Sequence, residues 1–158
     1  MFLCLAGVIL TGLIWFSGRR ETVQTDYLPM ETVTLAVATD LHVIAPSLTD
    51  GGEAFTQLTE QADGKFMPRI SEILDHFCAG VIAQHPDALI LSGDLSFNGA
   101  AESHRYIAEK LHEIEQAGVP VLALPGNHDL NSDMAARFQG ADVTLVESVN
   151  AEAFADIY

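Results

Sequence analysis

Three short apolar runs divide the chain, at residues 33–39, 88–92 and 119–124. None of them alternates regularly between apolar and polar positions, as a strand with one solvated face would. Short and continuously apolar runs are typical of strands buried on both faces, and such strands occur mainly in parallel sheets. The three runs therefore predict three strands inside an α/β domain.

Two amphipathic segments lie between these runs and predict helices at residues 66–84 and 101–117. In the first segment the apolar side chains recur at helical spacing, with Pro68 in the first turn and Pro86 beyond the end. In the second, Gly118 follows the last apolar position, where helices commonly end in a left-handed residue. The predicted order is β-α-β-α-β, and right-handed crossovers make the three strands parallel.

The remaining segments carry weaker patterns. Residues 43–65 are irregular, with a short helix predicted at 54–61, and such a stretch is either a functional loop or an Ω-like surface excursion. Residues 142–147 predict a further strand, after which Asn150 caps a final helix. That helix has no terminating signal, so we expect a domain that is truncated at its C-terminal end.

The chain begins with an uncharged apolar segment at residues 2–16 that two arginines follow. We expect a signal or anchor segment at 1–20, a linker at 21–32 and one domain at 33–158. The segment is short for a full span, which favours export, although no positive n-region precedes it. As an anchor with the arginines inside, it would instead keep the domain cytoplasmic. The expected location is extracytoplasmic, secreted or membrane-anchored, with membrane contact through residues 2–16 if they are not cleaved.

The composition excludes two classes of protein. The chain has 22 acidic and 7 basic side chains, a net charge of -15, and 49% hydrophobic residues. This apolar content is far too high for a disordered acidic chain. The strong negative charge repels phosphate backbones, so no nucleic-acid partner is expected. The two cysteines, Cys4 and Cys78, cannot form a disulfide framework and leave the redox compartment open.

Residues that can bind metals follow each predicted strand. Asp40 and His42 follow the first strand, Asp94 the second, and a Gly-Asn-His-Asp sequence at 126–129 the third. Because the carboxyl ends of parallel strands meet at one edge of the sheet, we expect these side chains to converge there. Carboxylate, imidazole and amide groups suit divalent transition metals. In an extended backbone Asp40 and His42 would point the same way while Leu41 turns toward the core.

These motifs resemble the first three signature blocks of the calcineurin-like metallophosphoesterases, and the surrounding sequence is similar to the exported bacterial members. The resemblance covers residues 33–131 and implies the amino-terminal part of that family's α/β sandwich fold. It also implies a hydrolase of small phosphoester substrates with two divalent metal ions, Mn, Fe or Zn. The implied roles are Asp40 and His42 as ligands of the first metal, Asp94 as the bridging ligand, Asn127 as a ligand of the second metal, His128 as the acid for the leaving group, and Asp129 as the residue that orients His128.

The resemblance is incomplete beyond His128. The family completes its metal site with later histidines, and no histidine follows His128 in this chain. His76, His104 and His112 fall on predicted helices, where a solvated or capping role is expected. We therefore expect the intact protein to be an enzyme and this chain alone to be weak or inactive. The alternative is a non-catalytic α/β module that keeps the motifs and binds a ligand or a partner protein.

Overall fold

The computed structural model describes residues 32–62 and 64–158, and the residues from Val33 to Tyr158 form one compact unit. The predicted signal or anchor segment and nearly all of the predicted linker lie outside the described residues. Export and membrane anchorage therefore stay predictions. Within the described ranges, no helix combines the length and the apolar character needed to cross a membrane.

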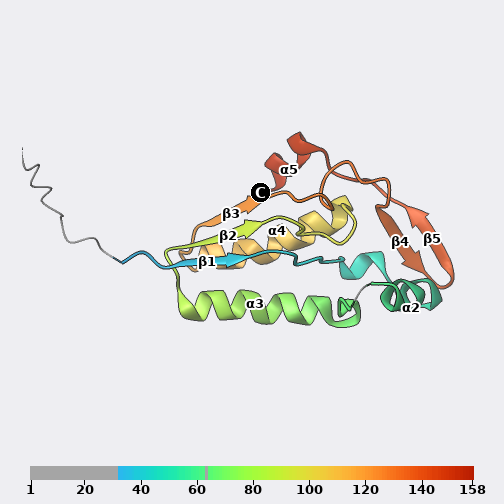
Figure 1. The fold of residues 1–158 in the computed structure, drawn as a ribbon, viewed down its shortest axis with the longest axis horizontal. Coiled ribbons are helices and arrows are strands. Elements are labelled where there is room, and N and C mark those ends of the chain that lie inside the picture. The colour runs from blue at the N-terminus through green and yellow to red at the C-terminus, as the bar shows by residue number, and fades with distance from the viewer. Residues whose placement is uncertain (1–31, 63) are drawn as a thin grey trace, which may run out of the picture. The chain divides into compact units, whose positions relative to one another are not determined.

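A three-stranded parallel sheet forms the centre of this unit (Figure 1). Its strands lie in the order β1 (Leu35–Ala38), β2 (Ala88–Ser92) and β3 (Val121–Leu124). In the register, Val37 pairs with Ile90, and Ile90 pairs with Leu122. The predicted parallel β-α-β-α-β arrangement is confirmed. Strand β3 begins later than predicted, after Pro120, which has no N–H to donate to a neighbouring strand.

Two helices connect the strands and pack against each other, α3 (Ile70–Gln84) and α4 (Ala101–Gln116). A short 3₁₀ turn, η2 (Met67–Arg69), precedes α3, so the regular helix begins later than predicted. His85, with φ of 46°, and Gly118, with φ of 90°, adopt the left-handed conformation just beyond the two helices. Gly118 therefore has the C-terminal position that its place in the sequence predicts.

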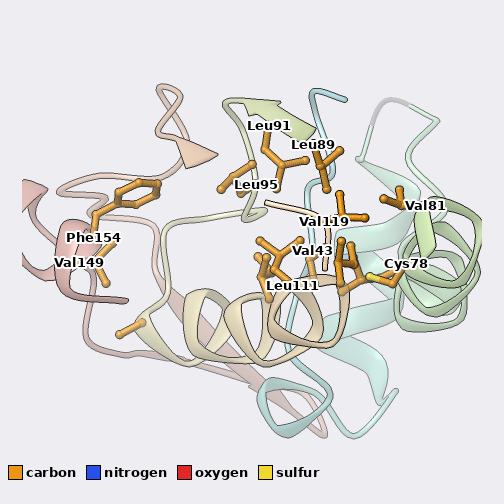
Figure 2. Close-up of a cluster of buried hydrophobic side chains, with 14 residues drawn as sticks. Val43, Cys78, Val81, Leu89, Leu91, Leu95, Leu111, Val119, Val149 and Phe154 are labelled. Carbon is orange, nitrogen blue, oxygen red and sulfur yellow. The ribbon is translucent and has the colours of Figure 1, made fainter. Parts of the chain in front are cut away.

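The main core lies between β2 and the two helices (Figure 2). Leu89 and Leu91 of β2 are fully buried there. The helices contribute the following buried side chains: Leu74, Cys78 and Val81 from α3, and Ile107, Leu111 and Ile114 from α4. Because the strand order follows the chain order, both crossovers advance in the same direction and place both helices on one face of the sheet.

The other face of the sheet is open in the part of the chain that the structure describes. Leu35 and Val37 of β1 and Leu122 and Leu124 of β3 are each more than half exposed. The prediction that the strands are buried on both faces is therefore wrong for these residues. The apolar side chains of these strands give the sheet two apolar faces, but the two helices cover only one of them.

The buried side chains of residues 44–62 belong to a second core. This stretch contains the 3₁₀ turn η1 (Pro46–Leu48) and the helix α2 (Glu53–Glu60), which the sequence predicted. Buried side chains on this stretch, including Leu48 and Phe55, pack with Phe138, which lies in the β-hairpin described below. The stretch is therefore an integral part of the fold and not a loose surface excursion.

A β-hairpin and a short helix complete the described chain. Strand β4 (Ala136–Gln139) pairs antiparallel with β5 (Asp142–Leu145). The sequence predicted β5 and missed β4. Helix α5 (Ala151–Ile157) is capped as predicted, because the Asn150 side chain accepts a hydrogen bond of 2.8 Å from the amide of Ala153.

Candidate metal centre

The loops that leave β1 and β2 run side by side at the carboxyl end of the sheet. The amide of Asp40 donates to the carbonyl of Gly93 at 3.1 Å, and the amide of His42 donates to the carbonyl of Asp94 at 3.0 Å. Backbone hydrogen bonds therefore continue past the ends of the strands. They fix Asp40 and His42 beside Asp94, although more than fifty residues separate the two loops in the sequence.

The backbone of these loops is strained where the candidate ligands lie. Asp40, His42 and Asp94 have φ of 57°, 45° and 52°, in the left-handed region that residues with a Cβ seldom occupy. The extended backbone predicted for Asp40 and His42 is therefore wrong, and strand alternation does not orient them. Strain of this kind persists only where the surrounding structure enforces it, and it is concentrated at functional sites.

The side chains of His42, Asp94 and His128 converge, since one donor atom from each lies within 4.8 Å of the other two. His42 Nε2 is 3.4 Å from a carboxylate oxygen of Asp40 and 3.9 Å from one of Asp94. The rings of His42 and His128 meet edge to face, with centroids 5.0 Å apart. The structure thus brings four of the predicted site residues together, and it places His128 among the groups that could hold a metal.

The protonation states in this cluster favour metal binding. Burial lowers the pKa of His42, and the positive charge of Lys65 adds to the effect. A hydrogen bond from the Thr39 hydroxyl, at 2.7 Å, lowers the pKa of Asp40, and His42 contributes further. A neutral imidazole beside an ionised carboxylate is the form in which both groups bind metals.

The residues fit a divalent metal ion. His42 Nδ1 is buried and has no hydrogen-bond partner among the described residues, while Nε2 faces the carboxylates of Asp40 and Asp94. The ring is therefore not held by an ordinary core hydrogen bond. Two carboxylates with one or two imidazoles are a donor set that suits Mn, Fe and Zn.

His128 is oriented by the main chain. Its Nδ1 lies 3.0 Å from the carbonyl oxygen of Phe97, and its amide donates to Asp94 Oδ1 at 3.1 Å. A carbonyl oxygen only accepts, so Nδ1 carries a proton and Nε2 is left for another partner. The partner of Nδ1 is therefore the main-chain carbonyl of Phe97 and not the predicted Asp129 carboxylate, and no sequence pattern points to Phe97.

The Asp129 carboxylate instead connects two loops. It is fully buried and accepts hydrogen bonds from the amides of Leu95 at 3.1 Å, Ser96 at 2.8 Å and Gly126 at 2.7 Å. The Ser96 hydroxyl donates a further bond at 2.9 Å. We call this arrangement the Asp129 latch. It holds the segment after Asp94 against the segment before Asn127.

Asn127 lies next to these contacts and is exposed. Its neighbour Gly126 is packed directly against Asp94, since a Cβ at Gly126 would lie 2.1 Å from Asp94 Oδ1. The close approach of the two loops therefore requires a glycine at position 126. The position of Asn127 suits the predicted ligand role, which stays a prediction.

The environment predicted for His104 is wrong. This residue was expected to be solvated or to cap a helix, but its side chain is fully buried, with Nε2 3.1 Å from the carbonyl oxygen of Asp129. A signal was present, because His104 continues the apolar stripe of α4 that contains Ile107, Leu111 and Ile114. A polar residue on the buried face of a helix indicates a specific partner in the interior.

Comparison with known proteins gives one family. The sequence profile of the calcineurin-like phosphoesterases matches residues 33–157. A protein of Synechococcus sp. named as a probable cyclic nucleotide phosphodiesterase is 32% identical over 100 residues, which are 62% of this chain and 32% of the relative. A protein of Pseudoalteromonas sp. with the same description is 26% identical over 142 residues, 90% of this chain and 46% of the relative. The chain thus spans less than half the length of these relatives.

Proposed function

Because this chain belongs to the calcineurin-like phosphoesterase family, we propose that it carries the amino-terminal part of a two-metal site that hydrolyses phosphodiesters. The observation that carries the proposal is the convergence of His42, Asp94 and His128 where three parallel strands end. The names of the two relatives support a phosphodiester substrate and make cyclic nucleotides the first substrates to test.

In the proposed site, Asp40 and His42 would hold one metal, Asn127 would hold the other, and Asp94 would bind both. Asp94 suits a bridging role because Oδ1 is fixed by the amide of His128 while Oδ2 faces His42. When bound, two divalent ions polarise the phosphate and lower the pKa of the water that attacks phosphorus. The carboxylates of Asp40 and Asp94 offset part of the positive charge that this chemistry requires.

His128 is the proposed general acid. With Nδ1 donating to the carbonyl of Phe97, Nε2 is the nitrogen that can carry a second proton toward the leaving-group oxygen. Because His128 lies in the same cluster as the candidate ligands, its proton would be close to the leaving-group oxygen of a bound substrate.

Lys65 is the proposed contact for the substrate's negative charge. Its positive charge contributes to lowering the pKa of both Asp40 and His42. Four other basic side chains form ion pairs, Arg69 with Glu72, Arg105 with Glu147, Lys110 with Asp75, and Arg137 with Glu102. Lys65 forms none with the described residues. In a chain of net charge -15, a cation beside the cluster would attract an anionic substrate.

The test separates the roles of Asp94 and His128 by metal content. Asp94→Asn should lose bound manganese, because an amide does not neutralise a cation. His128→Ala should keep manganese and lower turnover of bis-p-nitrophenyl phosphate by about 10²- to 10⁴-fold, the usual range for a general acid. Loss of manganese from His128→Ala would make His128 a ligand and would overturn the assignment of the general acid.

A version of the protein that contains all the family's metal ligands distinguishes an enzyme from a binding module. Turnover of 3′,5′-cyclic AMP or of the chromogenic diester, abolished by Asp40→Ala, would establish hydrolysis. Manganese binding without any turnover, in a protein that contains all the family's ligands, would favour the non-catalytic module.

A further inference from the structure

His104 lies in the interior of the domain, between the metal-binding loops and the end of the chain. Its ring is fully buried and contacts the rings of Phe154 and Tyr158, with centroid distances of 5.6 Å and 5.8 Å. Nε2 lies 3.1 Å from the Asp129 carbonyl oxygen, and Nδ1 lies 3.0 Å from the Tyr158 hydroxyl. Both ring nitrogens therefore have partners.

These partners define the tautomer. A carbonyl oxygen can only accept a hydrogen bond, so His104 Nε2 carries the proton and donates it to Asp129. Nδ1 is then an acceptor, and the Tyr158 hydroxyl donates to it at 3.0 Å rather than to the His104 carbonyl oxygen, which lies farther away at 3.4 Å. Burial lowers the pKa of His104, which keeps the ring neutral and consistent with this arrangement. The chain thus contains a directed series of bonds from Tyr158 through His104 to Asp129.

The bond to Asp129 has consequences for the metal site. The main chain of Asp129 is held by His104, and its carboxylate is the latch that binds the amides of Leu95, Ser96 and Gly126. These amides belong to the residues just after Asp94 and just before Asn127. A shift of Asp129 would therefore change the spacing between the two loops that carry the candidate ligands.

We propose that His104 is a positioning residue that holds Asp129 in place and thereby fixes the distance between the loop of Asp94 and the loop of Asn127. An apolar side chain would fill the same position in the stripe of α4 without the cost of burying a polar ring. The histidine is explained by the bond that it donates to Asp129. The part of this proposal that concerns metal affinity rests on the proposed function, and the part that concerns the loops does not.

Two variants separate positioning from simple packing. The side-chain amide of glutamine reaches the place of a histidine Nε2, so His104→Gln keeps a donor for the Asp129 carbonyl. Asparagine reaches only the place of Nδ1, so His104→Asn loses that donor. Leu111→Ala is the matched control, because Leu111 is buried on the same helix and its side chain has no hydrogen-bonding group that could hold Asp129.

The first measurement is amide hydrogen exchange in the full, metal-free chain. In His104→Asn, the amides of Leu95, Ser96 and Gly126 should exchange at least tenfold faster relative to the amides of α3. The exchange rates of these amides should stay near the wild-type rates in His104→Gln. In Leu111→Ala, any acceleration should affect α3 and the latch alike. If His104→Asn does not fold, Tyr158→Phe supplies the comparison, with a smaller acceleration in the same amides.

The second measurement is a manganese titration of the same proteins. Residues that support metal ligands typically change metal affinity by about 10- to 100-fold, and we expect a loss in this range for His104→Asn and little loss for His104→Gln. Unchanged exchange of the latch amides in His104→Asn, or equal effects in all three variants, would overturn the proposal. The expected exchange pattern without manganese binding by wild type would retain the positioning role and count against the proposed metal site.

Discussion

At the scale of single residues, the candidate site depends on how closely two loops approach. Gly93 has φ of 107°, and a Cβ there would lie 2.9 Å from the Cα of Gly126. A Cβ at Gly126 would lie 2.3 Å from the amide nitrogen of Asp94 as well as 2.1 Å from its Oδ1. Contacts this short with backbone atoms cannot be relieved by rotating a side chain. The two glycines are therefore as specific to this site as the charged residues.

Gly126→Ala should abolish manganese binding, because the new methyl group would displace Asp94 from its position beside His42. The matched control is Gly80→Ala in the middle of α3, where a Cβ would have no neighbour within 4 Å. That change should stabilise the protein by about 0.5–1 kcal/mol, since glycine is unfavourable inside a helix. Manganese titration and thermal unfolding of both variants are the measurements. Normal manganese affinity in Gly126→Ala would show that Asp94 is not a ligand.

Lys65→Gln should weaken substrate binding more than it slows the chemical step. A hydrogen bond to a charged group contributes about 1.5–3 kcal/mol, so KM for an anionic diester should rise about tenfold or more. Lys65→Arg should recover most of the loss because it restores the positive charge. Arg69→Gln is the control, since Arg69 is exposed and paired with Glu72. Steady-state kinetics would exclude the contact if Lys65→Gln and Arg69→Gln gave the same KM.

The sequence predicted the residues of the site better than their geometry. Asp40, His42, Asp94 and His128 were all predicted, because strand ends in a parallel sheet bring such residues together. The left-handed backbone at the first three could not be predicted, since it results from hydrogen bonds between distant loops. The latch role of Asp129 likewise depends on which amides lie nearby.

At the scale of elements, the β4–β5 hairpin is tied to the stretch at residues 43–65. The Asp50 carboxylate accepts hydrogen bonds from the amides of Gly52 at 2.8 Å and Gly140 at 2.9 Å. Gly140 lies in the turn between the two strands and has φ of 57°. One exposed carboxylate therefore joins two segments that are ninety residues apart.

This tie should depend on pH. The Gly140 amide, followed by that of Gly52, lowers the pKa of Asp50 below its ordinary value of 3.8. The contribution of the carboxylate to stability is thus complete above pH 3.8 and is lost as the pH falls through the lower, folded value. The protection factor of the Gly140 amide, which is its slowing relative to the intrinsic exchange rate at the same pH, should fall in this acidic range. In Asp50→Asn the protection factor should be low at every pH, and a fall of equal size in that variant would assign the effect to another group.

The elements differ in how well the sequence encodes them. Helices α3 and α4 were predicted from long apolar periodicity, which averages over several turns. Strand β4 was missed because it has only four residues and includes Arg137, whose pairing with Glu102 on α4 is a tertiary contact. Its buried residues, Ala136 and Phe138, do alternate, but so short a pattern also occurs in loops.

At the scale of the whole described unit, the sheet has one covered and one open face. Val37 and Leu122 lie on the open face on either side of Ile90, and they are 66% and 58% exposed. Leu35 and Leu124 extend the same apolar surface. Monomeric soluble proteins seldom expose a large contiguous apolar patch, because water favours its burial against another surface. The apolar runs predict apolar side chains on both faces of the sheet, and the positions of the two helices decide which face stays open.

The purified chain should therefore associate as its concentration rises, and a charged open face should prevent this. Val37→Lys combined with Leu122→Lys places two charges where the side chains already meet solvent, so the fold should tolerate them. Leu89→Lys is the control on the covered face, where a buried unpaired charge should prevent folding. Sedimentation velocity should show a concentration-dependent average mass for wild type and a constant monomer mass for the double variant. A double variant that fails to fold would show that the described face is not open to solvent. A wild-type chain that stays monomeric while the double variant folds would show that the patch is too small to drive association.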